Sequence, residues 1–269
     1  MALFNKNGGF MKNNPIGIFD SGIGGLTVLE KIYELLPNEK YIYLADYKNC
    51  PYGTKKEEEI KRIVTKNAKF LEIMGAKCIV IACNTASLFA SDIRKSVKIP
   101  VISVIEPACK KACEVSKNGR IGVIATQMTI KKESYQKRIL CDSKVPFGVP
   151  CSEFVDYIEN DFDNHELGKK IVKEKLNDLS KENIDTLIYG CTHFSLLEDK
   201  IKEILGDINY IDCGSPTAIL LKELLEKEDL LSENKNGSIK IYTTGEKVEL
   251  EKKINLFKII YEKIEEVKI

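Results

Sequence analysis

Several features that would point to particular classes of protein are missing from this 269-residue chain. It contains no tryptophan and only two histidines, and no two cysteines are separated by just two residues. Because structural zinc sites are built from such cysteine pairs and from histidines, the sequence predicts no metal site. No apolar run reaches the roughly 20 residues of a membrane-spanning helix, which predicts a soluble protein without a membrane partner.

Charge is nearly balanced as well, with 41 basic and 40 acidic residues and a net charge of +1. A nucleic-acid backbone or an anionic membrane surface as the main partner would call for a large positive excess. The balance therefore argues against both. The nine cysteines are an odd number, and no signal peptide precedes them, so we expect free thiols in a reducing cytoplasm.

What the chain does contain is an alternation of short apolar strands with longer helical patterns. Strands are predicted at residues 16–19, 41–45, 79–82, 101–105, 210–212 and 239–242. Helices are predicted up to Pro37, at about 55–74 and 87–96, after 215 and from about 246, with a break at Glu106-Pro107. This alternation predicts an α/β fold with parallel sheets and helices on both faces.

Two motifs recur at nearly the same interval. Ile121-Gly-Val-Ile-Ala-Thr126 repeats Ile16-Gly-Ile-Phe-Asp-Ser21 at an offset of 105 residues, and the cysteines of two further matching stretches, Cys83 and Cys191, are 108 residues apart. One internal duplication explains both intervals and predicts two α/β domains of similar plan, each contributing one cysteine. The alternative is that two βα units look alike by chance.

We expect the first domain to comprise residues 15–107 and 217–269, and the second to comprise residues 108–216. The last strand and helix are assigned to the first domain from their pattern, which makes that domain discontinuous. Residues 1–14 lack periodicity and are rich in Asn and Gly, so we expect a flexible N-terminal extension there.

The strongest candidates for chemistry are Cys83 and Cys191, which directly follow apolar strands. In open α/β sheets ligands bind at the carboxyl ends of strands, and a helix N-terminus there lowers a thiol pKa and attracts a carboxylate. We therefore expect two activated thiols with Asp20 and His193 as polar neighbours. Further hydrogen-bonding side chains in the same places are Asn84, Thr85 and Thr192. The alternative is that each cysteine is a small buried apolar residue.

The turn Asp20-Ser-Gly-Ile-Gly-Gly25 follows a strand and opens a helix, as a dinucleotide-binding fingerprint does. Its glycines, however, lack the full Gly-x-Gly-x-x-Gly spacing, and the Asp20 carboxylate would repel a phosphate. We favour a site for an ammonium group or a thiol, with the glycines allowing a tight turn and close backbone approach.

Taken together, these residues resemble the cofactor-independent glutamate racemases of bacterial cell-wall synthesis. The motifs that carry the resemblance are Phe19-Asp-Ser-Gly-Ile-Gly-Gly25, Pro51-Tyr-Gly53, Ala82-Cys-Asn-Thr-Ala-Ser87, Val104-Ile-Glu-Pro107, Ile121-Gly-Val-Ile-Ala-Thr126 and Gly190-Cys-Thr-His-Phe194. The resemblance implies two domains related by pseudo-twofold symmetry, with the active site in the cleft between them.

The resemblance also implies roles for individual residues. Cys83 and Cys191 are the two bases, Asp20 is the acidic partner near Cys83, and His193 with Glu159 attends Cys191. The positions that hold substrate are Asp20, Ser21, Tyr52, Gly53, Asn84, Thr85, Thr192 and His193. Two departures from the family pattern are Ala45 before Asp46, where glycine is usual, and Ser195, where proline is common.

The implied reaction is the interconversion of L-glutamate and D-glutamate without a cofactor, in the cytoplasm, to supply D-glutamate for peptidoglycan. Because the family is commonly dimeric, a homodimer is expected. One alternative is an aspartate racemase, which His193 and the Asp20-Ser-Gly motif disfavour. A second is a non-racemising thiol redox or ligand-binding protein that uses Cys83 and Cys191 as a switch.

Overall fold

The computed structural model describes residues 12–269. Residues 1–11 of the extension predicted for residues 1–14 therefore lie outside the described residues. The backbone oxygen of Lys12 accepts a 2.7 Å hydrogen bond from Lys77 Nζ, and the Lys12 ammonium pairs with Asp229 at 2.7 Å. Because Lys77 is itself buried and paired with Glu39 at 2.5 Å, the first described residues rest on a buried ion pair.

The chain forms two compact units. Unit 1 contains the described residues up to Val104 together with Gly214–Ile269, and unit 2 contains Ile105–Cys213. Each unit has one sheet, and every strand pair in both sheets is parallel. The predicted class, α/β with two parallel-sheet domains, is confirmed.

Unit 1 has six strands in the order β10-β9-β2-β1-β3-β4. Their bounds are β1 Ile16–Asp20, β2 Lys40–Ala45, β3 Cys78–Ile81, β4 Val101–Ser103, β9 Ser238–Thr243 and β10 Lys263–Glu266. Every residue of β1 and β3 is buried. This burial explains their continuous apolar runs, because a central parallel strand is covered on both faces.

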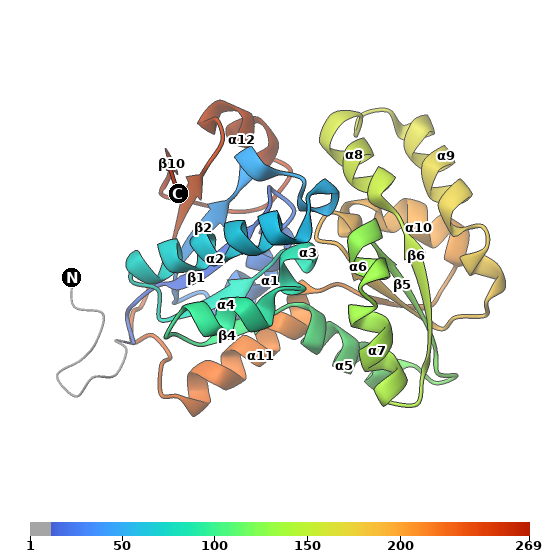
Figure 1. Cartoon of the computed structure of the whole chain (residues 1–269), viewed down its shortest axis with the longest axis horizontal. Helices are drawn as coiled ribbons and strands as arrows, with labels where there is room; N and C mark the ends of the chain where they lie inside the picture. Colours follow the sequence, from blue (N-terminus) through green and yellow to red (C-terminus); the bar gives the residue numbers. More distant parts are fainter. Residues whose placement is uncertain (1–11) are drawn as a thin grey trace. The chain divides into compact units, whose positions relative to one another are not determined.

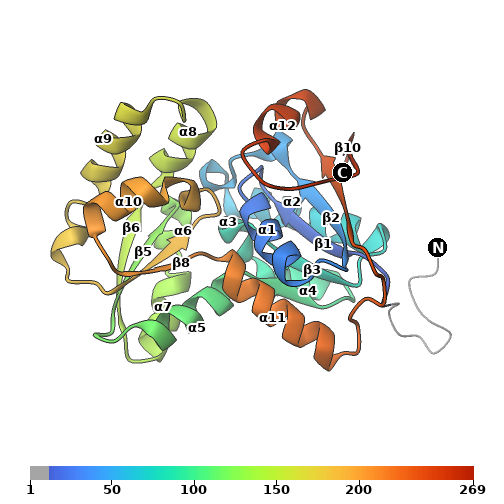
Figure 2. The same ribbon diagram turned by 180° about the vertical axis from the view of Figure 1, so that it is seen from behind.

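Helices cover both faces of this sheet. Their bounds are α1 Leu26–Leu35, α2 Glu57–Ile73, α3 Asn84–Ser87, α4 Ala90–Ser96, α11 Gly214–Lys227 and α12 Lys247–Ile254, with single-turn helices η1 Tyr47–Asn49 and η2 Tyr52–Thr54. Helices α2 and α4 lie on the face turned to the viewer in Figure 1, and α1 and α11 on the face seen in Figure 2. Helix α2 buries Ile60, Val64 and Leu71 along one side, as an amphipathic helix on a sheet does.

Unit 2 has four strands in the order β6-β5-β7-β8. The strands are β5 Arg120–Ala125, β6 Val145–Pro150, β7 Thr186–Gly190 and β8 Asn209–Ile211. The helices are α5 Ile105–Val115, α6 Gln127–Lys131, α7 Ser134–Cys141, α8 Ser152–Asn160, α9 His165–Leu176 and α10 Glu198–Leu205, with single turns η3 Leu179–Lys181 and η4 Phe194–Leu197. One core cluster joins β7 to α8, α9 and α10. Within it the rings of Phe154 and Phe194 pack edge to face, with 5.2 Å between the ring centroids.

The two sheets share one topology. The order β2-β1-β3-β4 in unit 1 corresponds to β6-β5-β7-β8 in unit 2, and unit 1 adds β9 and β10 at one edge. In each unit the first strand has the second on one side and the third on the other. The direction of winding therefore reverses beside the first strand, and the crevice at such a reversal is where open α/β sheets bind ligands.

Two predictions about local structure were wrong, and two strands were not predicted. Glu106-Pro107 does not break the chain, because α5 begins at Ile105 and Pro107 lies in its first turn, where the missing N–H costs no helical hydrogen bond. The helix predicted over 87–96 is two helices, α3 and α4, separated at Leu88 and Phe89. Strands β6 and β10 were not predicted; β6 contains Pro146 and Pro150, which are tolerated because it is an edge strand.

Within residues 12–269, no helix combines the length and apolar character needed to cross a membrane.

Candidate active site

Asp20 is the last residue of β1, the strand at which the winding of unit 1 reverses. Its carboxylate is fully buried and accepts a 2.9 Å hydrogen bond from the backbone N–H of Gly25, while Ser21 Oγ lies 3.5 Å from its other oxygen. A Cβ atom on Gly25 would lie 2.5 Å from the Asp20 Cβ. The turn therefore requires glycine for close approach, and Gly25 has an ordinary negative φ of −63°.

Cys83 lies at the carboxyl end of β3, next to β1, and is the N-cap of the short helix α3. Its Sγ accepts a hydrogen bond from the Ala86 N–H at 3.5 Å and lies 3.7 Å from Ser21 Oγ. The side chain is buried, with 6% of the residue exposed. Cys83, Ser21 and Asp20 thus form one cluster at adjacent strand ends.

The pKa of the Cys83 thiol is raised to about 12. Burial is the largest cause and the nearby Asp20 carboxylate adds to it, while hydrogen bonds from Ala86 and Ser21 act in the opposite direction. The N–H at the start of helix α3 lowers this pKa, as expected, but burial outweighs it, so the net shift is upward. A single turn of helix supplies one N–H to the sulfur, which does not compensate for desolvation and a neighbouring negative charge. A cationic group placed beside Asp20 and Cys83 would oppose both effects.

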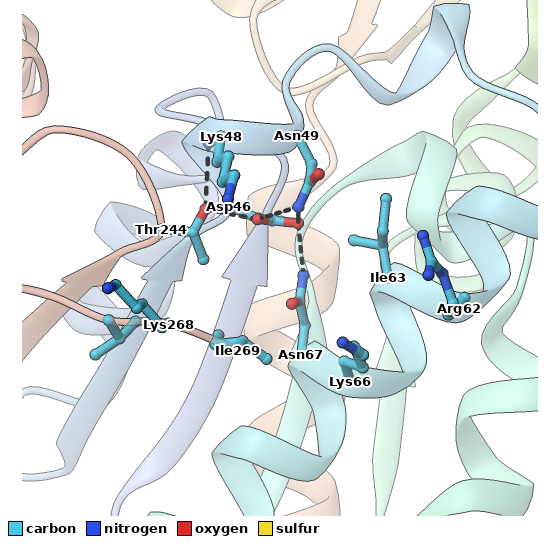
Figure 3. A pocket seen from close by; sticks show the side chains of 11 residues that line it. Asp46, Lys48, Asn49, Arg62, Ile63, Lys66, Asn67, Thr244, Lys268 and Ile269 are labelled. Atoms are coloured by element: carbon cyan, nitrogen blue, oxygen red, sulfur yellow. Dashed lines mark hydrogen bonds between the residues drawn. The ribbon is translucent and has the colours of Figure 1, made fainter.

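Tyr52 is held by a buried carboxylate that the sequence reasoning did not select, Asp46. The phenol of Tyr52 donates to Asp46 at 2.6 Å. The same carboxylate accepts from Asn67 at 3.1 Å, Asn49 at 2.9 Å and Thr244 at 2.6 Å, and these three contacts are drawn in Figure 3. Asn67 also donates to the Tyr52 oxygen at 2.9 Å. Burial and the charge of Asp46 raise the pKa of Tyr52 well above its usual value, so the phenol keeps its proton and donates it.

The remaining predicted residues of unit 1 lie on the same short segments. Asn84 and Thr85 open helix α3 and are both buried, so they follow Cys83 into the same end of the sheet. Gly53 lies in the single turn η2 beside Tyr52 and is partly exposed.

Cys191 directly follows β7, the strand of unit 2 that corresponds to β3. Its Sγ lies 3.8 Å from His193 Nδ1, and His193 Nε2 lies 2.8 Å from Glu159 Oε1, which comes from α8. Cys191 and His193 are buried, and the Glu159 side chain is 13% exposed. The three residues form a chain from thiol through imidazole to carboxylate, in which the carboxylate selects the ring tautomer.

Two further features shape this second cluster. A Cβ atom on Gly190 would lie 2.8 Å from the backbone oxygen of Ile124, so only glycine lets β7 lie this close to β5 immediately before Cys191. Thr192, the residue between Cys191 and His193, is also buried. It therefore follows the thiol as Asn84 follows Cys83.

The predicted residues thus fall into two groups, one in each unit. The missed residue, Asp46, carried a sequence signal: an acidic residue directly after an apolar strand and just before the Pro-Tyr-Gly motif. Among residues 12–269, no group of three or more His, Cys, Asp or Glu side chains is arranged to hold a metal ion.

The fold and these clusters define a class of protein: an α/β protein in which each of two parallel-sheet units carries a buried thiol at the carboxyl end of a strand. A family model described as Asp/Glu/Hydantoin racemase matches residues 16–221. The chain belongs to this racemase family and is therefore an isomerase.

Relatives with assigned names agree with the family model. The chain is 44% identical to a glutamate racemase of Persephonella marina over 241 residues, which cover 88% of this chain and 90% of the relative. Among solved structures, glutamate racemase isoform RacE1 of Bacillus anthracis superposes with a TM-score of 0.92 at 35% identity, covering 96% of this chain and 98% of that one. Glutamate racemase of Francisella tularensis in complex with D-glutamate gives 0.89 at 34% identity, with the same coverage.

Proposed function

We propose that the protein interconverts L-glutamate and D-glutamate, with Cys83 and Cys191 as the two acid–base groups. The observation that carries the proposal is sequence identity of 44% and 40% to two proteins named glutamate racemase, over 88% and 93% of this chain. The presence of D-glutamate in the structure of one such relative supports the choice of substrate.

The chemistry follows from the need to invert a stereocentre. One thiolate removes the α-proton from one face of the amino acid and becomes a thiol, while the other thiol delivers its proton to the opposite face and becomes a thiolate. The reverse reaction exchanges the two roles, and no atom or electron is gained or lost overall. The proposal therefore places the two cysteines on opposite faces of one substrate.

The neighbours of each thiol fit this exchange. Asp20 offers a carboxylate for the α-ammonium group of glutamate, and that positive charge would oppose the effects that raise the pKa of Cys83. In unit 2, the His193 ring can exchange a proton with the neighbouring Cys191, and the Glu159 carboxylate orients that ring. Within unit 1, Ser21 Oγ lies 3.5 Å from Asp20 and 3.7 Å from Cys83, and within unit 2, His193 lies 3.8 Å from Cys191.

Substrate binding is proposed for the residues that surround the two thiols. Ser21, Asn84, Thr85 and Thr192 supply hydroxyl and amide groups near the strand ends, and Tyr52 with Gly53 lies on the adjoining loop. Backbone N–H groups after each cysteine would stabilise negative charge on the substrate carboxylate as the α-proton leaves.

The biological context is proposed on the same basis. We propose a cytoplasmic homodimer that supplies D-glutamate for peptidoglycan without a cofactor, as the family resemblance implies. The free cysteines fit a reducing compartment.

Chiral chromatography of purified protein incubated with L-glutamate, D-glutamate or L-aspartate tests the proposal. We expect both glutamate enantiomers to approach an equal mixture and aspartate to react at least a hundredfold more slowly. Faster conversion of aspartate would reassign the substrate. No conversion of any of the three would overturn the proposal and favour a thiol switch or a binding protein.

A further inference from the structure

Unit 1 contains a cavity of about 350 Å³ that the racemase proposal does not use. It lies beyond the carboxyl ends of β2, β9 and β10 and beside helix α2, and Asp46, Asn67 and Thr244 form part of its wall (Figure 3). Small-molecule sites begin at about 300 Å³. The cavity is therefore large enough for a small ligand.

Four basic side chains line this cavity: Lys48, Arg62, Lys66 and Lys268. Within the described part of the chain, none of them forms a side-chain hydrogen bond or an ion pair. Two neighbouring basic residues are paired, since Lys61 contacts Asp92 at 2.7 Å and Lys55 contacts Glu59 at 3.2 Å. The four basic groups of the cavity, by contrast, have no carboxylate paired with them in the described part of the chain.

The polar neutral residues of the wall do not offset this charge. Asn49, Asn67 and Thr244 all donate to Asp46, which is the only side-chain carboxylate among the described residues that line the cavity. Tyr52 donates to the same carboxylate. Among the side chains that line the cavity, one fully engaged negative charge therefore faces four positive ones, and this excess attracts anions.

We propose that this cavity binds a small oxyanion of the phosphate class, either free or carried on a small molecule. A single carboxylate would leave most of the positive charge unbalanced, whereas a phosphate or pyrophosphate group brings two or more negative charges and several acceptor oxygens. Guanidinium and ammonium groups bind such oxygens through charge-assisted hydrogen bonds. Ile63, Val267 and Ile269 also line the cavity and offer apolar surface to a small carrier.

Isothermal titration calorimetry of the full chain with inorganic phosphate, pyrophosphate and glycerol 3-phosphate tests this site, at constant ionic strength and with chloride as the background anion. Saturating D-glutamate is present in a parallel set, so that an anion occupying the substrate site is displaced. We expect at least one of the three to bind with a Kd below about 1 mM and to keep that affinity when glutamate is present. The preferred probe distinguishes a free ion from a phosphorylated small molecule.

Variants locate the bound anion. The double substitution Arg62→Gln with Lys66→Gln should weaken binding at least tenfold, and Lys268→Gln, at the opposite side of the cavity, should weaken it at least threefold. Lys69→Gln is the matched control, because Lys69 is exposed on the same helix and does not line the cavity; its affinity should change less than twofold. Circular dichroism checks that each variant is folded.

Absence of binding by all three probes, displacement by glutamate, or equal weakening in Lys69→Gln would overturn the proposal. The readout is binding alone, so it does not depend on racemase activity. If the protein fails to racemise glutamate, the titrations without glutamate and their variants still decide whether this site exists.

Discussion

At the scale of single residues, the environment of Cys83 decides how its thiol can be used. A sulfur that is buried beside a carboxylate holds its proton, although hydrogen bonds from the backbone of Ala86 and from the backbone and hydroxyl of Ser21 oppose this. Such a thiol is a poor nucleophile toward general reagents, but once ionised it is a strong base. The proposed reaction needs the strong base, and the low reactivity toward other reagents protects the thiol from side reactions.

Alkylation of Cys83 should therefore depend on pH far above the usual range of a thiol. Because only the thiolate reacts and the pKa of Cys83 is raised to about 12, its rate should rise about tenfold per pH unit and keep rising beyond pH 9, whereas an ordinary thiol levels off near about 8.5. Mass spectrometry of iodoacetamide-treated protein measures this, with the exposed Cys141 as the internal reference. A rate for Cys83 that levels off below pH 9 would contradict the account.

Asp46 is a positioning residue in this account, because it touches Tyr52 and acts through it. Asp46→Asn removes the charge that four donors share and turns an amide N–H toward them, so we expect a loss of about 3 kcal/mol in the free energy of unfolding. We also expect KM for glutamate to rise more than kcat falls, since the affected loop carries proposed substrate contacts.

Urea unfolding and steady-state kinetics test this prediction, with Tyr52→Phe as the comparison. If Asp46 acts through Tyr52, the double variant should raise KM no more than Asp46→Asn alone. Additive changes in KM, or a loss of stability with unchanged KM, would show that Asp46 has only a structural role.

At the scale of elements, the segment that leads into β5 is fixed to the segment that leads into β7. Asp185, just before β7, accepts hydrogen bonds from Ser116 Oγ at 2.6 Å, from the Lys117 N–H at 2.6 Å and from the Asn118 N–H at 2.7 Å. Burial by itself would raise the pKa of Asp185, but these hydrogen bonds, with one from Thr186, hold it below its usual value. The ionised carboxylate therefore stabilises unit 2.

Asp185→Asn should lower the free energy of unfolding by about 2 kcal/mol at pH 7. A carboxyl whose folded pKa is depressed contributes stability above its unfolded pKa of about 3.9, and this contribution is lost as pH falls through the folded pKa. The difference between wild type and variant should thus be constant from pH 5 to 8 and shrink below about pH 4. Urea unfolding across this range measures it, and a difference that grows in acid would refute the assignment.

The elements also show what a sequence can predict. The strands β1, β3 and β7, which end at Asp20, Ile81 and Gly190, were predictable because central parallel strands are buried on both faces and appear as unbroken apolar runs. Strand β10 was not predictable in this way, because its sequence Lys-Ile-Glu-Glu has a single buried residue and it forms only by pairing with β9.

Contacts between distant segments were the least predictable part of the candidate site. Asp46 meets Asn67 and Thr244, which are 21 and 198 residues away along the chain, so no local pattern reveals the network. Glu159 was named from the family resemblance alone. Its 2.8 Å contact with His193 depends on how α8 packs in unit 2, and the pKa of Cys83 likewise depends on burial that its own strand does not determine.

At the scale of the whole molecule, the two sheets repeat one plan. The shared order of four strands agrees with the internal duplication inferred from two motif intervals, and the third strand of each repeat delivers a cysteine. A duplicated fold that supplies the same group twice suits a reaction that needs one proton acceptor and one proton donor. Two chemically equal groups can also exchange these roles, which a reversible inversion requires.

The most direct test of this central claim is the early distribution of deuterium when L-glutamate is converted in deuterated water. With two bases, the proton removed from one face does not return from the other, so the account predicts that the D-glutamate formed carries deuterium at Cα while the recovered L-glutamate still carries hydrogen. Cys83→Ala and Cys191→Ala should each abolish the conversion while leaving the protein folded. Early product that retains the original hydrogen, or full activity in either variant, would contradict the two-cysteine account.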